Sequence, residues 1–168
     1  MDKLTAGIAH KFENDINSDY IISSRYKRDT TDCQALKKYL FADIRDNFIG
    51  KVIDGDIIAA GENFGCGSAM EAAAQVLRAA GFRVIIAKSF ARSFYRNAMN
   101  NGILLIEADM SFLNDGESVC VERDENDGLW LTTCSGRVSL GKIGAINEAL
   151  FNEGGLIEYV NKHGSLPG

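Results

Sequence analysis

The sequence predicts an α/β fold with a parallel β-α-β core and an antiparallel hairpin toward the C-terminus. Short apolar runs at 57–60, 83–87 and 103–106 alternate with segments that carry apolar residues at helical spacing. Such alternation indicates right-handed β-α-β units and parallel strand pairing. From Ser118 to Ser139 the apolar residues instead recur at every second position, which is typical of antiparallel strands.

The segment before this core is expected to hold one strand and one helix. Residues 3–12 alternate loosely between apolar and polar side chains, which predicts a short first strand. After a polar turn, Asp19–Ile22 is expected to resume extended structure before a charged loop. Thr30–Asp32 offers N-cap side chains for a helix over about 32–42. Residues 43–56 are predicted to be irregular and polar.

The core strands lead into helices through glycine-containing turns. Gly61–Ser68 is a glycine-punctuated turn after the strand 57–60, and it opens an Ala-rich helix over about 69–80 that stops at Gly81. The remaining helices are expected over 90–100, 142–152 and 155–162.

Composition limits the classes of partner. The chain has 168 residues, with 18 Lys and Arg against 23 Asp and Glu and a net charge of −5. This length predicts a single domain over residues 1–168. The acidic balance, with no basic run longer than two residues, predicts no nucleic-acid partner and no anionic membrane surface. Without an apolar stretch of signal-peptide or membrane-span length, we expect a cytoplasmic protein.

The cysteines do not form a recognisable metal or redox motif. Cys33, Cys66, Cys120 and Cys134 are separated by 33, 54 and 14 residues. These spacings match no CxxC arrangement, and we expect reduced thiols and no cofactor bound by this chain itself.

The glycine-punctuated turn is the candidate functional loop. A strand, a glycine turn and a helix start gather backbone N–H groups around one point, which attracts anions. Gly65–Ser68 has this form, but it fits neither a P-loop nor GxGxxG. Ser68 is either a functional hydroxyl or a simple N-cap. Cys66 is either a small buried residue or an activated thiol, with His10 and His163 both distant in sequence.

Three blocks of sequence, taken together, are more specific than any short motif. They are Gly61–Ser68, Val84–Arg92 and Phe94–Ala98. On these blocks the chain, from about His10 to Tyr159, resembles the small subunit of 3-isopropylmalate dehydratase. That family is the detached swivel domain of the aconitase superfamily.

The resemblance implies a fold, a partner and a reaction. The expected fold is a layered β/β/α swivelling domain. It would dock on an iron–sulfur large subunit, as a heterodimer or heterotetramer, and the partner would hold a 4Fe-4S cluster. The expected activity is that of a hydro-lyase on a small hydroxy-dicarboxylic acid, 3-isopropylmalate or a related 2-alkylmalate, with leucine biosynthesis as the suggested pathway.

The resemblance also implies roles for individual residues. Ser68 matches the serine that removes a proton from carbon, and Gly67 and Cys66 of its turn are candidate substrate-binding residues. Asp19 matches an aspartate that borders the active site, although a turn aspartate can simply cap its own backbone. Arg28 matches an arginine that reads the variable part of the substrate, although it could also be a solvated surface charge.

One departure from the family pattern affects the substrate site. Where the family usually reads Gly-Ser-Ser-Arg-Glu-His, residues 67–72 read Gly-Ser-Ala-Met-Glu-Ala. Met70 therefore stands where an arginine would grip a substrate carboxylate, and a thioether cannot donate a hydrogen bond. Three explanations stay open: a different, more apolar substrate; compensation by Arg25, Lys27 or Arg28; or a non-catalytic or regulatory paralogue.

Overall fold

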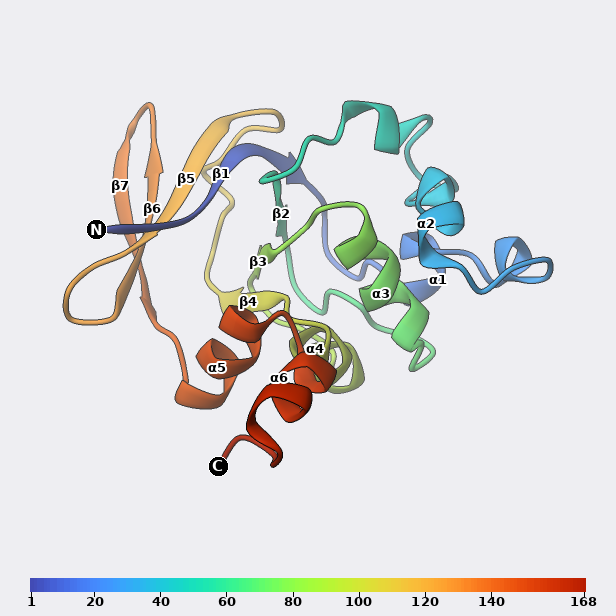
Figure 1. Cartoon of the computed structure of the whole chain (residues 1–168). Coiled ribbons are helices and arrows are strands. Elements are labelled where there is room, and N and C mark those ends of the chain that lie inside the picture. Colours follow the sequence, from blue (N-terminus) through green and yellow to red (C-terminus); the bar gives the residue numbers. More distant parts are fainter.

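The computed structural model describes residues 1–168 and contains one curled, seven-stranded sheet (Figure 1). The strand order is β4-β3-β2-β1-β5-β6-β7. The strands are β1 (Asp2–Lys11), β2 (Ile57–Ala60), β3 (Val84–Ala87), β4 (Leu104–Glu107), β5 (Ser118–Arg123), β6 (Gly128–Thr133) and β7 (Gly136–Lys142). The predicted parallel core and antiparallel C-terminal strands are both confirmed, since β1 to β4 pair in parallel and β5 to β7 pair antiparallel.

The long first strand joins the two halves of the sheet. Ala9, His10 and Lys11 of β1 pair in parallel with β2, whereas the residues from Asp2 to Ile8 pair antiparallel with β5. A strand that is shared in this way lets the sheet curl, so that its antiparallel half folds over one face of its parallel half.

Alternation along the parallel strands divides the interior into two cores. Successive strand residues point to opposite faces. The face covered by helices contains Ile58, Ala60, Ile85, Ala87 and Leu105. The face covered by the antiparallel strands contains Ile57, Ala59, Val84, Ile86, Leu104 and Ile106. Both faces are buried, which explains the continuous apolar runs and confirms the predicted β/β/α layering.

The helices lie at one side of the sheet and at its lower end in Figure 1. The α-helices are α1 (Ser18–Ile21), α2 (Cys33–Leu36), α3 (Glu71–Ala79), α4 (Arg92–Asn100), α5 (Ala145–Glu153) and α6 (Leu156–His163). The 3-10 helices are η1 (Ser24–Lys27), η2 (Lys37–Tyr39) and η3 (Phe48–Lys51). No helix has both the length and the apolar character that a membrane span requires.

Two local predictions in the N-terminal segment are wrong. The segment Asp19–Ile22, expected to be extended, lies mostly in the single-turn helix α1, because the Asn17 side chain accepts a hydrogen bond from the Asp19 N–H at 2.9 Å. The helix expected over 32–42 is broken into α2 and η2. It ends at Leu40, whose ψ of 123° leaves the helical region, and Phe41 follows with a left-handed φ of 53° and a completely buried ring in the helix-side core.

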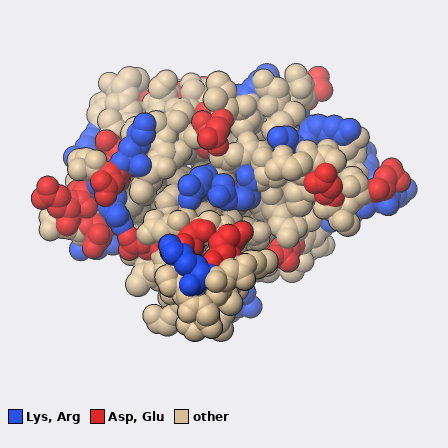
Figure 2. All heavy atoms as spheres, in the orientation of Figure 1, with Lys and Arg blue, Asp and Glu red and all other residues tan.

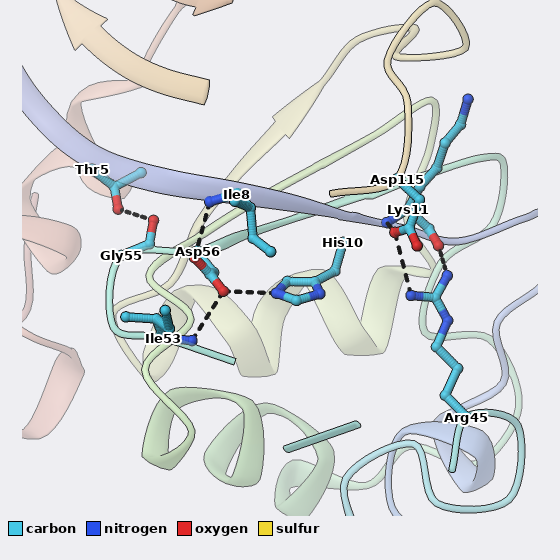
Figure 3. Close-up of polar contacts among 9 residues, drawn as sticks. All are labelled: Thr5, Ile8, His10, Lys11, Arg45, Ile53, Gly55, Asp56 and Asp115. Atoms are coloured by element: carbon cyan, nitrogen blue, oxygen red, sulfur yellow. Dashed lines mark hydrogen bonds and ion pairs between the residues drawn. The ribbon is translucent and has the colours of Figure 1, made fainter. Parts of the chain in front are cut away.

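A buried hydrogen bond between His10 and Asp56 fixes β1 to the turn before β2. His10 Nε2 donates to Asp56 Oδ2 at 2.7 Å, and the two residues are only 4% and 2% exposed. The same carboxylate accepts the backbone N–H groups of Ile8 at 2.9 Å and Ile53 at 3.0 Å (Figure 3). Because a carboxylate can only accept, these three donors satisfy the buried charge of Asp56.

We predict that Asp56→Ala lowers the free energy of unfolding by about 3 to 5 kcal/mol, because it leaves the buried His10 ring and two partly buried N–H groups without an acceptor. Urea denaturation followed by circular dichroism measures this change. Asp46→Ala is the matched control, since Asp46 is an exposed aspartate of the neighbouring loop and should change stability by less than about 0.5 kcal/mol. Equal stability of the two variants would contradict the role given to Asp56.

Candidate functional site

The candidate site lies at the edge of the sheet where the parallel strands end. Loops that follow the carboxyl ends of neighbouring parallel strands meet at this edge, which is where open α/β sheets bind ligands. The loop after β2 is hydrogen bonded on both sides. Gly65 N–H donates to Ile16 O in the loop after β1 at 2.8 Å, and Phe64 N–H donates to Ser89 O in the loop after β3 at 3.0 Å.

The turn at Gly67 is held by the loop after β1. Ser18 N–H donates to Cys66 O at 2.8 Å, and the buried Ser18 hydroxyl donates to Ser68 O at 2.7 Å. Gly67 has φ of +88°, a left-handed conformation that favours glycine, and any side chain at this position would collide with the side-chain amide of Asn17. The turn therefore needs both the glycine and the neighbouring loop.

Ser68 does not occupy the position expected for it. The helix predicted from residue 69 begins at Glu71, and Met70 is its N-cap residue, so Ser68 lies in the loop rather than at the helix start. The N-cap reading of Ser68 is therefore wrong. Ser68 is exposed, and the backbone N–H groups of Gly67, Ser68 and Ala69 donate to no other backbone group. Backbone N–H groups without a backbone acceptor, in an exposed turn next to a hydroxyl, can donate to an anion.

Asp19 is brought close to this turn by α1. It follows Ser18, which bonds directly to the Ser68 carbonyl, and its side chain is half-buried. The alternative reading, in which Asp19 caps its own turn, is wrong because the capping side chain belongs to Asn17. Sequence reasoning missed Asn17, although an asparagine two residues before an aspartate is a recognisable capping signal.

The loop after α1 carries three basic residues, Arg25, Lys27 and Arg28. Only Lys27 contacts Met70, the N-cap residue of α3. Lys27 Nζ lies 2.8 Å from Met70 Sδ. Arg25 is engaged elsewhere: it pairs with Asp43, and its hydrogen bond to Tyr26, together with the charge of Asp43, raises the pKa of its guanidinium. Arg28 is exposed at the end of η1. The structure therefore places Asp19 next to Ser18, which bonds to the turn that holds Cys66, Gly67 and Ser68, and it places Lys27 against Met70.

The cysteines and histidines do not form a second reactive centre. Cys66 is half-buried, and His10 and His163 bond instead to Asp56 and to Glu153, the latter at 3.2 Å. Burial, with the nearby carboxylates of Asp32 and Glu71, raises the pKa of the Cys33 thiol. No three His, Cys, Asp or Glu residues lie close enough together to hold a metal ion, and this chain's residues therefore do not fit an iron–sulfur cluster.

The Ser68 turn is an open surface rather than an enclosed pocket. Gly67, Ser68 and Ala69 are all exposed. A cavity of about 520 Å³ lies elsewhere, against His10 and Arg45. Figure 2 shows acidic and basic side chains interspersed over the drawn face, without a continuous basic surface. The candidate residues therefore lie on an open surface.

Comparison with known proteins identifies the family. Residues 8–111 match the aconitase C-terminal domain. The chain is 40% identical to the methanogen homoaconitase small subunit of Methanocaldococcus jannaschii, over 93% of this chain and 91% of that one. It is 38% identical to 3-isopropylmalate dehydratase small subunit 2 of Archaeoglobus fulgidus, over 95% and 96% of the two chains.

The fold agrees with these sequence comparisons. The crystal structure of a 3-isopropylmalate dehydratase from Methanocaldococcus jannaschii superimposes with a TM-score of 0.83 at 36% identity, covering 95% of each chain. The resemblance inferred from the three sequence blocks is confirmed. The chain therefore belongs to the aconitase C-terminal domain family, among the small subunits of hydro-lyases of the 3-isopropylmalate dehydratase type.

Proposed function

We propose that Ser68 is the base of a hydro-lyase site that dehydrates and rehydrates a small hydroxy-dicarboxylic acid, 3-isopropylmalate or a related 2-alkylmalate. The observation that carries the proposal is the exposed Ser68 hydroxyl on a turn whose N–H groups have no backbone acceptor. The relatives support this substrate class, since their names are those of 3-isopropylmalate dehydratase and homoaconitase subunits.

Dehydration removes a proton from one carbon and hydroxide from its neighbour, and leaves a double bond between the two carbons. Ser68 Oγ takes the proton in this direction and returns it during rehydration. A serine hydroxyl is a weak base, and its alkoxide form needs stabilisation. The unpaired N–H groups of Gly67, Ser68 and Ala69 and the start of α3 provide positive partial charge for it.

The other candidate residues act on the substrate around this hydroxyl. Asp19, presented by α1, borders the reacting carbon from the loop after β1. Cys66 and Gly67 belong to the same turn. Because Gly67 has no side chain, the substrate can approach the backbone closely there. Arg28, at the exposed end of η1, reads the substituent that differs between related hydroxy-diacids.

The remaining chemistry requires a partner. The open surface around Ser68 supports a site completed by a large subunit, in a heterodimer or heterotetramer. We assign the 4Fe-4S cluster to that subunit, because no residues of this chain are arranged to hold it. When bound, such a cluster would supply the Lewis acid that assists departure of the hydroxyl group.

Ser68→Ala should lower kcat of the assembled enzyme by about 100-fold to 10,000-fold, because it removes the group that accepts the proton. Turnover is followed through the absorbance of the alkene product. Ser135→Ala is the control, since Ser135 is an exposed serine in the turn between β6 and β7. Unchanged turnover in Ser68→Ala would remove Ser68 from the mechanism and favour a non-catalytic role for the subunit.

Arg28→Ala should change the preference between hydroxy-diacids, because a guanidinium hydrogen bond to a charged substituent contributes about 1.5 to 3 kcal/mol. The ratio of kcat/KM for homocitrate and isopropylmalate measures this preference. In the control Arg137→Ala, an exposed arginine of β7 is replaced and the ratio should stay constant. A constant ratio in Arg28→Ala as well would make Arg28 an ordinary surface charge.

The chain purified alone should contain less than about 0.1 iron per protomer and show no turnover, because its thiols are too dispersed to bind a cluster. Anaerobic reconstitution with the large subunit should restore turnover. The prediction is checked by measuring the iron and sulfide content of each separated subunit. A stoichiometric cluster on this chain would contradict the division of the site between two subunits.

A further inference from the structure

We propose that Lys27 binds a carboxylate of the substrate and supplies the positive charge that the methionine at position 70 lacks. This inference rests on the proposed function of the Ser68 turn. Lys27 Nζ lies 2.8 Å from Met70 Sδ, although the two residues are 43 positions apart in sequence. Met70 is two residues after Ser68, so this contact places the ammonium group at the residue that joins the Ser68 turn to α3.

The ammonium group of Lys27 has no anionic partner. A thioether sulfur is a neutral and weak acceptor, whereas an ammonium group has three donors to satisfy. Three other lysines have stronger acceptors. Lys11 donates to two backbone carbonyls, Lys162 to Glu153, and Lys88 pairs with Asp109. Lys27 is half-buried and forms no ion pair, so an incoming carboxylate would gain a charge partner already partly removed from water.

The fold determines where Lys27 can reach. The preceding residue, Tyr26, stacks on Tyr39 of η2 with ring centroids 4.1 Å apart and an interplanar angle of 5°. This stacking anchors η1 against the body of the protein. Arg25 is held by its ion pair with Asp43 and is not available to the turn. Lys27 is therefore the basic residue of this loop that contacts Met70, two residues after Ser68.

The charges around Lys27 suit an anionic substrate. The N-cap residue of α3, Met70, makes no side-chain capping bond, so the first N–H groups of this nine-residue helix also present positive partial charge. Two acidic residues flank the area, Asp29 and Glu71, but neither forms an ion pair with Lys27. An ammonium group is a point charge without the fork of a guanidinium, so it would bind one carboxylate with less demand on its orientation.

The proposal is tested in the assembled enzyme by removing the cation at position 27 and then placing a cation at position 70 instead. In Lys27→Met, KM for the hydroxy-diacid should rise about 10-fold to 100-fold, with a smaller change in kcat. The dissociation constant of an unreactive dicarboxylate such as succinate, measured by calorimetry, should rise in parallel. The double variant Lys27→Met/Met70→Arg should recover most of this loss, because it returns a cation to the same contact.

Control variants separate the possible outcomes. Lys51→Met replaces an exposed lysine of η3 and should leave KM and succinate binding unchanged. Gel filtration verifies that each variant still assembles with the large subunit.

The outcomes for Lys27 and Ser68 are distinguishable. If Lys27→Met binds and turns over substrate normally while Ser68→Ala is inactive, the assignment of Lys27 is overturned and the function of Ser68 stands. Turnover that survives Ser68→Ala would overturn the proposed function itself. A failure of Met70→Arg to rescue Lys27→Met would show that a cation at this contact is not what binds the substrate.

Discussion

The candidate site depends on the backbone hydrogen bonds that join the loop after β1 to the glycine turn after β2. Gly65 and Ser18 donate to carbonyls across the two loops, and the Ser18 hydroxyl holds the carbonyl of Ser68. The N–H groups of Gly67, Ser68 and Ala69 in the turn itself donate to no backbone carbonyl. Residues 67–69 therefore stay outside the helix, which starts only at Glu71, and their N–H groups are free to meet a ligand.

The rest of the fold supports this arrangement. β1 belongs to both halves of the sheet, so its position fixes the loop that carries Asn17, Ser18 and Asp19. The buried pair of His10 and Asp56 fixes β1 to the start of β2, which carries the glycine turn. The two strands that present the site are therefore held together before β2 by the buried hydrogen bond between His10 and Asp56, and after β2 by the backbone hydrogen bonds between the loops.

The longer elements could be predicted from the sequence, but the short ones could not. The core strands are buried on both faces, and a continuous apolar run such as Val84–Ala87 indicates this directly. α1 has four residues, and its conformation depends on a cap from Asn17 and on burial of Ser18 and Ile21. A helix of this length is marginal without tertiary contacts. Propensity therefore could not distinguish it from a strand.

The site could be predicted in part for the same reason. Ser68, Gly67 and Asp19 stand out in sequence because glycine turns and turn aspartates are local signals. The contact between Lys27 and Met70 joins residues 43 positions apart in sequence. It depends on how η1 packs against η2. Sequence reasoning could name Lys27 as one of three basic candidates. Only the packing of the stacked Tyr26 selects it over Arg25 and Arg28.

The central claim is that one small-subunit surface provides the proton acceptor and a carboxylate partner for a hydroxy-diacid. A crystal structure of the complex with the large subunit, bound to an unreactive hydroxy-diacid analogue, tests it most directly. Ser68 Oγ should lie within about 3.5 Å of the carbon that loses its proton, and Lys27 Nζ should lie within hydrogen-bond distance of a carboxylate. An analogue bound away from the glycine turn, with Ser68 facing solvent, would contradict it.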